Sequence, residues 1–178
     1  MARLGSVASV LAGLITLGWI ARRLRRCVPA YDPAPWNDSD GVQYNNNCYN
    51  YACNLQTGTF AQPGRASGSM YPLPIDCPGV DQGALSDGLV TLDCDHGCGC
   101  RSCCHKVALV VSPSPDFNDF HWYRLDRNGR WSHKPGGGQA TNLDSSSNPI
   151  TDPRTADRGP YTVFCGCYCV CKGKVTIN

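Results

Sequence analysis

Cysteine is the residue that most constrains what this chain can fold into, because it occupies 13 of the 178 positions. Packing alone does not explain so many cysteines, which leaves disulfides, metal binding or thiol chemistry. Nine of them lie in two short segments, CDHGCGCRSCCH at 94–105 and CGCYCVC at 165–171. In the second segment cysteine alternates with other residues, so its four sulfurs share one face if the segment is extended.

The sequence leaves three chemical states possible for these sulfurs. The sequence favours a disulfide framework that joins the first segment to the second, and it predicts no cofactor. Free thiols in a reducing compartment are a second state. The third is zinc, held for example by Cys94, Cys98, Cys165 and Cys167.

The charge of the chain is divided unevenly. The whole sequence has a formal net charge of +2, yet residues 1–31 carry five arginines and no acid. Residues 32–178 therefore hold 11 basic and 14 acidic side chains, a net charge of −3. Phosphate recognition depends on clustered Lys and Arg, so we expect no nucleic-acid partner. The same split predicts two parts, a targeting or anchor segment at 1–31 and a single cysteine-rich domain at 32–178.

The N-terminal part contains an apolar run. Residues 4–20 include no charged side chain, and four arginines follow between 22 and 26. Seventeen residues are the lower limit for a helix that spans a membrane, so we predict a single-pass membrane anchor. A secretory signal peptide and a mitochondrial presequence are the alternatives. The arginines favour a cytoplasmic domain and the cysteines favour an oxidising compartment, so the side of the membrane stays open.

The pattern of residues 32–178 predicts helices first and strands afterwards. Apolar residues at 48, 51, 52 and 55 indicate a short helix, and 81–90 is a candidate for a second one. The run KVALVV at 106–111 predicts a buried strand, and Asn-Gly at 128–129 predicts a hairpin between 120–125 and 130–134. A last strand is expected at 161–170. The predicted fold class is α+β: an N-terminal hydrophobic helix, then short helices packed on an antiparallel sheet.

One cysteine outside the two segments has the position of a nucleophile. Cys48 lies in the first turn of the predicted short helix, where unpaired backbone amides favour a thiolate. His105 precedes the strand at 106–111, and His121 lies in the strand at 120–125. Antiparallel neighbours bring such residues side by side, so one imidazole can take the Cys48 proton while the other orients it.

These residues resemble the papain-like superfamily of thiol hydrolases, in particular NlpC-type and CHAP-type peptidases and amidases. The matching segments are NNNCYNYACN around Cys48, HKVALVV at His105 and DFHWYR around His121. The resemblance implies a papain-like fold and a hydrolase that cleaves an amide or peptide bond. With the predicted anchor at 4–20, the hydrolase is expected to be tethered to a membrane. The resemblance also implies that Gln43 or Asn47 stabilises the oxyanion.

His133 offers a different assignment. If the hairpin turn carries a bulged Gly129, Tyr123 opposes His133, and His133 lies diagonal to His121 on one face. His121 is then the base and His133 the orienting group. The alternative to any hydrolase is a disulfide-stapled, non-catalytic binding or structural module, in which Cys48 is merely packed or bridged.

Overall fold

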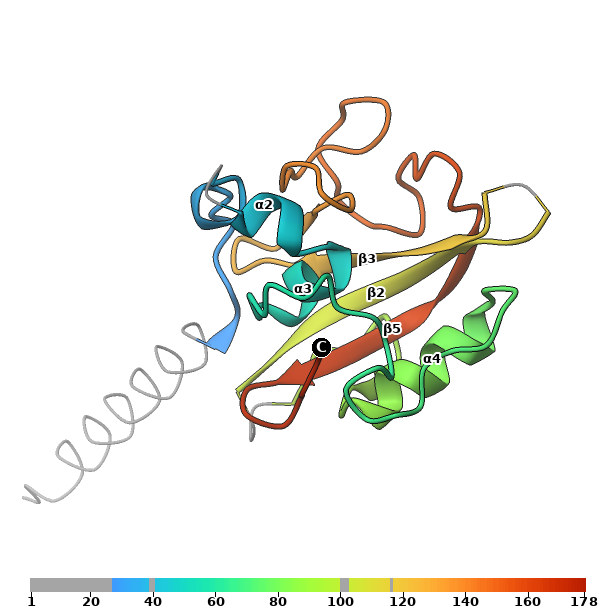
Figure 1. Ribbon diagram of the computed structural model, residues 1–178. Helices are drawn as coiled ribbons and strands as arrows, with labels where there is room; N and C mark the ends of the chain where they lie inside the picture. The colour runs from blue at the N-terminus through green and yellow to red at the C-terminus, as the bar shows by residue number, and fades with distance from the viewer. Residues whose placement is uncertain (1–26, 39–40, 100–102, 116) are drawn as a thin grey trace, which may run out of the picture.

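The structure, a computed structural model, describes residues 27–38, 41–99, 103–115 and 117–178. Within these residues, five strands form an antiparallel sheet in the order β1-β5-β2-β3-β4. Figure 1 shows β5, β2 and β3 side by side. The central strand is buried on both faces, which explains its continuous apolar run. The strands are β1 (Val90–Leu92), β2 (Cys104–Ser112), β3 (Asp119–Leu125), β4 (Trp131–His133) and β5 (Val163–Cys171).

Short helices accompany the sheet. Two of them, α3 and α4, pack on the same face of the sheet (Figure 1). The helices of the described residues are the 3-10 helix η1 (Ala34–Trp36) and the α-helices α2 (Val42–Asn45), α3 (Cys48–Cys53) and α4 (Cys77–Ser86).

Helix α3 owes its limits to three asparagines. The side chain of Asn47 accepts hydrogen bonds from the backbone amides of Tyr49 and Asn50, so the helix begins at Cys48. The Asn50 side chain accepts the amide of Asn47 in return and completes a capping box. Asn54 ends the helix in left-handed backbone with a φ of 56°.

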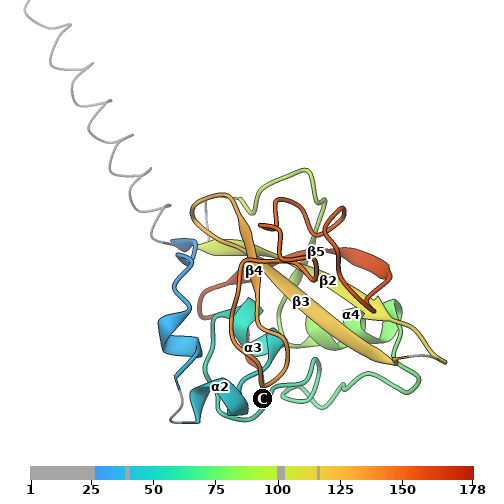
Figure 2. The ribbon, with the colours of Figure 1, turned by 90° about the horizontal axis from the view of Figure 1, so that it is seen from above.

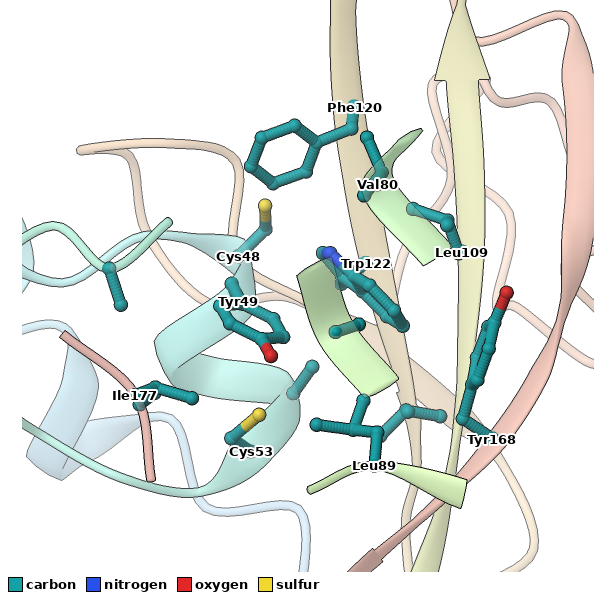
Figure 3. Close-up of a cluster of buried hydrophobic side chains, with 14 of the residues drawn as sticks. Cys48, Tyr49, Cys53, Val80, Leu89, Leu109, Phe120, Trp122, Tyr168 and Ile177 are labelled. Carbon is teal, nitrogen blue, oxygen red and sulfur yellow. The ribbon is translucent and has the colours of Figure 1, made fainter. Parts of the chain in front are cut away.

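The sheet separates two hydrophobic clusters. On one face, Leu109 and Trp122 pack against the buried residues of α3 and α4 (Figure 3). Val107 belongs to the same cluster. On the other face, Ala108 and Val110 pack against the long segment that joins β4 to β5. That segment runs beside the sheet from β4 back to β5 (Figure 2). Both faces of β2 are therefore covered, and α3 is held at the β3–β4 side of the sheet.

The hairpin between β3 and β4 confirms the prediction made from Asn-Gly. Tyr123 is the partner of His133 in the register of the two strands. The amide of Asp126 donates to the carbonyl of Arg130 at 2.9 Å, and Gly129 has a φ of 80°. A left-handed φ costs glycine little, which is why this turn needs that residue.

The predicted fold class is wrong. The described chain is mostly a small antiparallel sheet with few short helices, rather than a papain-like α+β arrangement. The second helix begins at Cys77, not at residue 81, because Asp76 caps it and Pro78 occupies its first turn. The predicted hydrophobic helix at 4–20 lies outside the described residues. Among the residues that are described, no helix is long and apolar enough to span a bilayer.

Candidate functional site

Disulfides fasten β5 to the segments that surround it. Every second residue of the strand, from Cys165 to Cys171, forms a disulfide. The partners of Cys165, Cys167, Cys169 and Cys171 are, in that order, Cys77, Cys94, Cys98 and Cys104. A further disulfide joins Cys27 to Cys103, so the described residues hold five in all.

Simple alternation predicts that the four sulfurs of β5 all lie on one face. In the structure they do not. Cys165 packs against the cluster under α4, whereas Cys167 belongs to the cluster on the opposite face. The cause is a β-bulge, because Leu109 pairs with Gly166 while the next residue of β2 pairs with Phe164. The extra residue at 165 turns its side chain to the other face.

The disulfide framework that the sequence favours is the state seen in the structure. Cys94 and Cys167 are bonded to each other, and Cys98 and Cys165 are bonded to Cys169 and Cys77. A sulfur in a disulfide offers no thiolate to a metal ion. In the described residues, no group of three or more Cys, His, Asp or Glu side chains has the arrangement of a metal site. Zinc at these cysteines stays a prediction for the reduced chain.

Cys48 has the predicted position but not the predicted environment. It is the first residue of α3 and is 5% exposed, with Phe120 and Trp122 beside it (Figure 3). Burial raises the pKa of the Cys48 thiol to about 12, although the backbone amide of Trp122 opposes the shift. The backbone amides of Cys48 and Tyr49, at the start of α3, also lower this pKa, but burial outweighs them. The thiol is therefore protonated at neutral pH.

The structure brings His121 and His133 together and leaves His105 apart. The carbonyl of Leu143 can only accept, so His133 Nε2 donates to it at 2.9 Å. His133 Nδ1 then accepts from His121 Nε2 at 2.7 Å. His105 Nε2 donates to the carbonyl of Ala52 at 2.7 Å, and burial lowers the pKa of His105 to about 4. Hydrogen bonds hold the three histidines, and no described hydrogen bond joins them to Cys48.

The predicted oxyanion residues are also bonded within the chain. The side-chain amide of Asn47 donates to the carbonyl of Ala61 at 2.7 Å, in addition to capping α3. The side-chain amide of Gln43 donates to the carbonyl of Gly137 at 3.2 Å. Both amides therefore position backbone segments of the chain.

A buried lysine near these residues escaped the sequence analysis. Lys134 is fully buried, and its ammonium donates to the carbonyls of Gln43, Asn46 and Gly136 at 2.5, 2.5 and 2.8 Å. Burial lowers the pKa of Lys134 to about 8. The lysine ties the start of α3 to β4. Nothing in the sequence HKPGGG distinguishes it from a solvent-exposed lysine after a strand.

A second buried cation joins α3 to the β3–β4 hairpin. Arg124 donates from Nε to Asp126 at 2.9 Å and from Nη2 to the hydroxyl of Tyr51 at 2.9 Å. Its guanidinium also lies 4.0 Å from the centre of the Tyr51 ring. Ser132 completes the network, with its Oγ 2.7 Å from the Tyr51 hydroxyl and 2.5 Å from Asp126. The sequence pattern marks Arg124 only as one residue of a strand.

The environment of the free thiols gives a direct prediction. We expect iodoacetamide at pH 8 to modify Cys48 in the native chain at least about a hundredfold more slowly than in the unfolded chain, because burial raises the pKa of its thiol to about 12. Burial raises the pKa of Cys53 as well, so it should be protected similarly. Mass spectrometry of the peptides that contain each thiol measures the two rates. Native labelling of Cys48 at the rate of an exposed thiol would contradict this account.

Fold and chemistry together define a class of protein: a small antiparallel sheet stapled by disulfides, with protonated thiols and paired polar groups inside. The chain is 51% identical over 143 residues to Insoluble matrix shell protein 1 of Ruditapes philippinarum. The match covers 80% of this chain and 90% of that protein. The chain therefore belongs to the family of this shell matrix protein. No family model matches the chain, and no solved structure matches it.

Several expectations from the sequence are corrected by these findings. The resemblance to papain-like thiol hydrolases is wrong, because the relative is a shell matrix protein and the described chain is braced by disulfides. For the same reason we withdraw the hydrolase and protease class, the peptide or amide substrate, the membrane partner and the membrane location. The findings favour the alternative, a disulfide-stapled, non-catalytic structural module.

Proposed function

We propose that the chain is a structural component of the insoluble matrix of a shell, and that its partners are other components of that matrix. The observation that carries this proposal is the 51% identity, over most of both chains, to a protein named for that matrix. The cross-linked sheet supports it, because an extracellular matrix is an oxidising environment in which disulfides persist.

The architecture suits a component that must keep its shape. Four disulfides of the described residues converge on β5, so the strand cannot separate from α4, β2 or the segment at 94–98 without breaking covalent bonds. Disulfides limit the unfolded ensemble and so protect a small domain against unfolding. The buried Arg124 and Lys134 then fix α3 and the hairpin by hydrogen bonds.

The test is to locate the protein in the shell. Shell of the animal that produces it is dissolved in a chelator, and the soluble extract and the insoluble residue are digested separately. Mass spectrometry should find peptides of residues 103–133 concentrated in the insoluble residue. Peptides confined to soft tissue and the soluble extract would contradict the proposal.

A second measurement addresses the non-catalytic role. The purified, oxidised chain is incubated with a mixture of peptides and amides, beside a Cys48→Ser variant as the matched control. We expect no difference between them. Hydrolysis by the natural chain that the variant lacks would favour the hydrolase reading again.

A further inference from the structure

Two buried histidines meet on the face of the sheet opposite α3 and α4. His121 of β3 lies against the rings of Tyr123 and Tyr161, which pack in the cluster on that face. His133 of β4 stacks on Tyr123. Because His133 Nε2 donates to the carbonyl of Leu143, its Nδ1 is bare and accepts from His121 Nε2 at 2.7 Å. We refer to His121 and His133 as the histidine pair.

The histidine pair contacts both ends of one segment. Residues 142–162, here the connecting segment, lead from β4 towards β5 and contain no helix and no strand beyond an isolated bridge. Near the start of the segment, the carbonyl of Leu143 accepts from His133 at 2.9 Å. Near its end, the ring of Tyr161 stacks on His121 with the ring centres 5.0 Å apart. The two imidazoles therefore close the segment onto the sheet.

No disulfide reinforces this closure. The sequence has no cysteine between Cys104 and Cys165, so the connecting segment is held by non-covalent contacts. Ile150 packs in one cluster with Ala108 of β2, and its carbonyl accepts from the amide of Trp131 at 3.1 Å. A part of a fold held by few contacts opens locally while the rest stays folded. The segment can therefore open without the strands that the disulfides fasten.

The hydrogen bond within the pair depends on the charge of its rings. A neutral imidazole has one donor and one acceptor nitrogen, whereas an imidazolium has two donors. If both rings are protonated, His121 Nε2 and His133 Nδ1 both carry hydrogen and face each other with like charges. Burial lowers the pKa of both rings, and the neighbouring His133 lowers the pKa of His121 further. The closed segment therefore favours two neutral rings.

The groups around the pair do not balance two buried charges. Burial raises the pKa of the Tyr123 and Tyr161 hydroxyls, so both tyrosines that contact the pair are neutral. Asp144 of the connecting segment raises the pKa of His133, but less than burial lowers it. The other ionisable groups close by act on the two tyrosines, and they are Cys48, Asp119, Asp157 and Arg158.

We propose that the histidine pair is an acid-sensitive latch, which holds the connecting segment on the sheet while its rings are neutral and releases it when both are protonated. Release would expose the apolar face formed by Ala108, Val110 and Trp131, while the disulfide-bonded strands stay folded. This property goes beyond the proposed structural role and does not require it.

The sign of the pH dependence follows from the lowered pKa values. In the released segment both histidines titrate near 6.5, and in the closed segment they titrate at lower pH. The closed state therefore has its full stability above about pH 6.5 and loses it as the pH falls towards the lowered pKa values. Each proton taken up on release raises the opening equilibrium by up to about tenfold per pH unit.

The experiment is hydrogen exchange of the full, oxidised chain between pH 7 and pH 5, with protection factors corrected for the intrinsic effect of pH on exchange. The protection of amides in the connecting segment should fall at least about tenfold across this range. Amides of β2 and β5 should keep their protection. Carboxyl groups titrate near pH 4 when unperturbed, below the range measured.

Matched variants assign the effect to the pair. A double variant, His121→Gln with His133→Gln, keeps amide donors and acceptors but cannot become charged, so its protection should change less than about twofold. His105→Gln removes a buried histidine outside the pair, one that donates to the carbonyl of Ala52. It should respond to pH as the natural chain does. Peptide mapping of the disulfides shows that each variant has folded.

Nuclear magnetic resonance of the histidine rings tests the latch without any variant. At pH 7 both rings of the pair should be neutral with hydrogen on Nε2, and both should become charged over the range in which the segment loses protection. Constant protection of the segment, an equal loss in the double variant, or a simultaneous loss in β2 and β5 would overturn the proposal. Charging of both rings with the segment still protected would overturn it as well.

Discussion

Reduction of the disulfides should unfold this chain at room temperature without any denaturant. Each cross-link to β5 closes a loop of roughly 70 to 90 residues in the unfolded chain, and losing a native disulfide typically costs about 2–5 kcal/mol. Together the four come to about 8–20 kcal/mol, which is as much as the roughly 5–15 kcal/mol of total stability typical of a domain. Near-ultraviolet circular dichroism during a titration with dithiothreitol measures the loss. A reduced chain that keeps its native spectrum would contradict this view.

Removing one disulfide at a time should lower the free energy of unfolding by amounts that differ between disulfides, which provides an internal control. With the other bonds intact, Cys77–Cys165 closes a ring of about 20 residues, whereas Cys98–Cys169 closes a ring of about 8. Loop entropy then predicts losses of about 3 and about 2 kcal/mol for the paired Cys→Ser variants. Urea unfolding of both variants gives the order. A reversed order would show that packing, rather than loop entropy, decides the cost.

Arg124→Met should lower the free energy of unfolding by about 3–5 kcal/mol, because it leaves the buried carboxylate of Asp126 without its cation. The variant also deprives the Tyr51 hydroxyl of a donor. Arg124→Lys keeps the charge but not the forked geometry of the guanidinium, so it should lower the free energy of unfolding by less than Arg124→Met does. Chemical denaturation at neutral pH measures all three chains. A loss below 1 kcal/mol for Arg124→Met would contradict the role given to the network.

The pH dependence of that variant gives a second readout. Burial raises the pKa of Asp126 in the natural chain, and removing the guanidinium raises this pKa further. The folded variant then binds a proton more tightly than the unfolded chain does. The loss in free energy of unfolding that Arg124→Met shows against the natural chain should therefore shrink as the pH falls. The change should occur between the raised pKa of Asp126 and its unfolded value near 3.9. Arg124→Met combined with Asp126→Asn has no such carboxyl and should not show the effect.

The fold could be predicted where the sequence contains a local signal. The apolar run at 106–111 marked the central strand, and Asn-Gly marked the hairpin with its register. The alternating cysteines marked a disulfide-bonded strand. Their partners could not be predicted, because pairing depends on which segments lie beside β5. The bulge at Cys165 turned one sulfur to the opposite face and defeated simple alternation.

The sequence could predict where the residues of the site lie along the chain, but not what surrounds them in the fold. Asn47 does cap a short helix at Cys48, as the pattern indicated. The sequence did not show that β3 covers this end of the helix, and that contact is what raises the pKa of the thiol. Arg124 and Lys134 look like ordinary charged residues at strand positions. Their burial is a tertiary property, and no local pattern reports it.

The cross-links overlap along the chain, and this has a consequence for durability. Cys27 is bonded to Cys103, and the residues bonded to β5 extend from Cys77 to Cys104. A single backbone scission at any point from Cys27 to Cys171 therefore yields two fragments that remain one covalent molecule. A protease that nicks a surface loop would release no piece of this part of the protein until a reductant arrived.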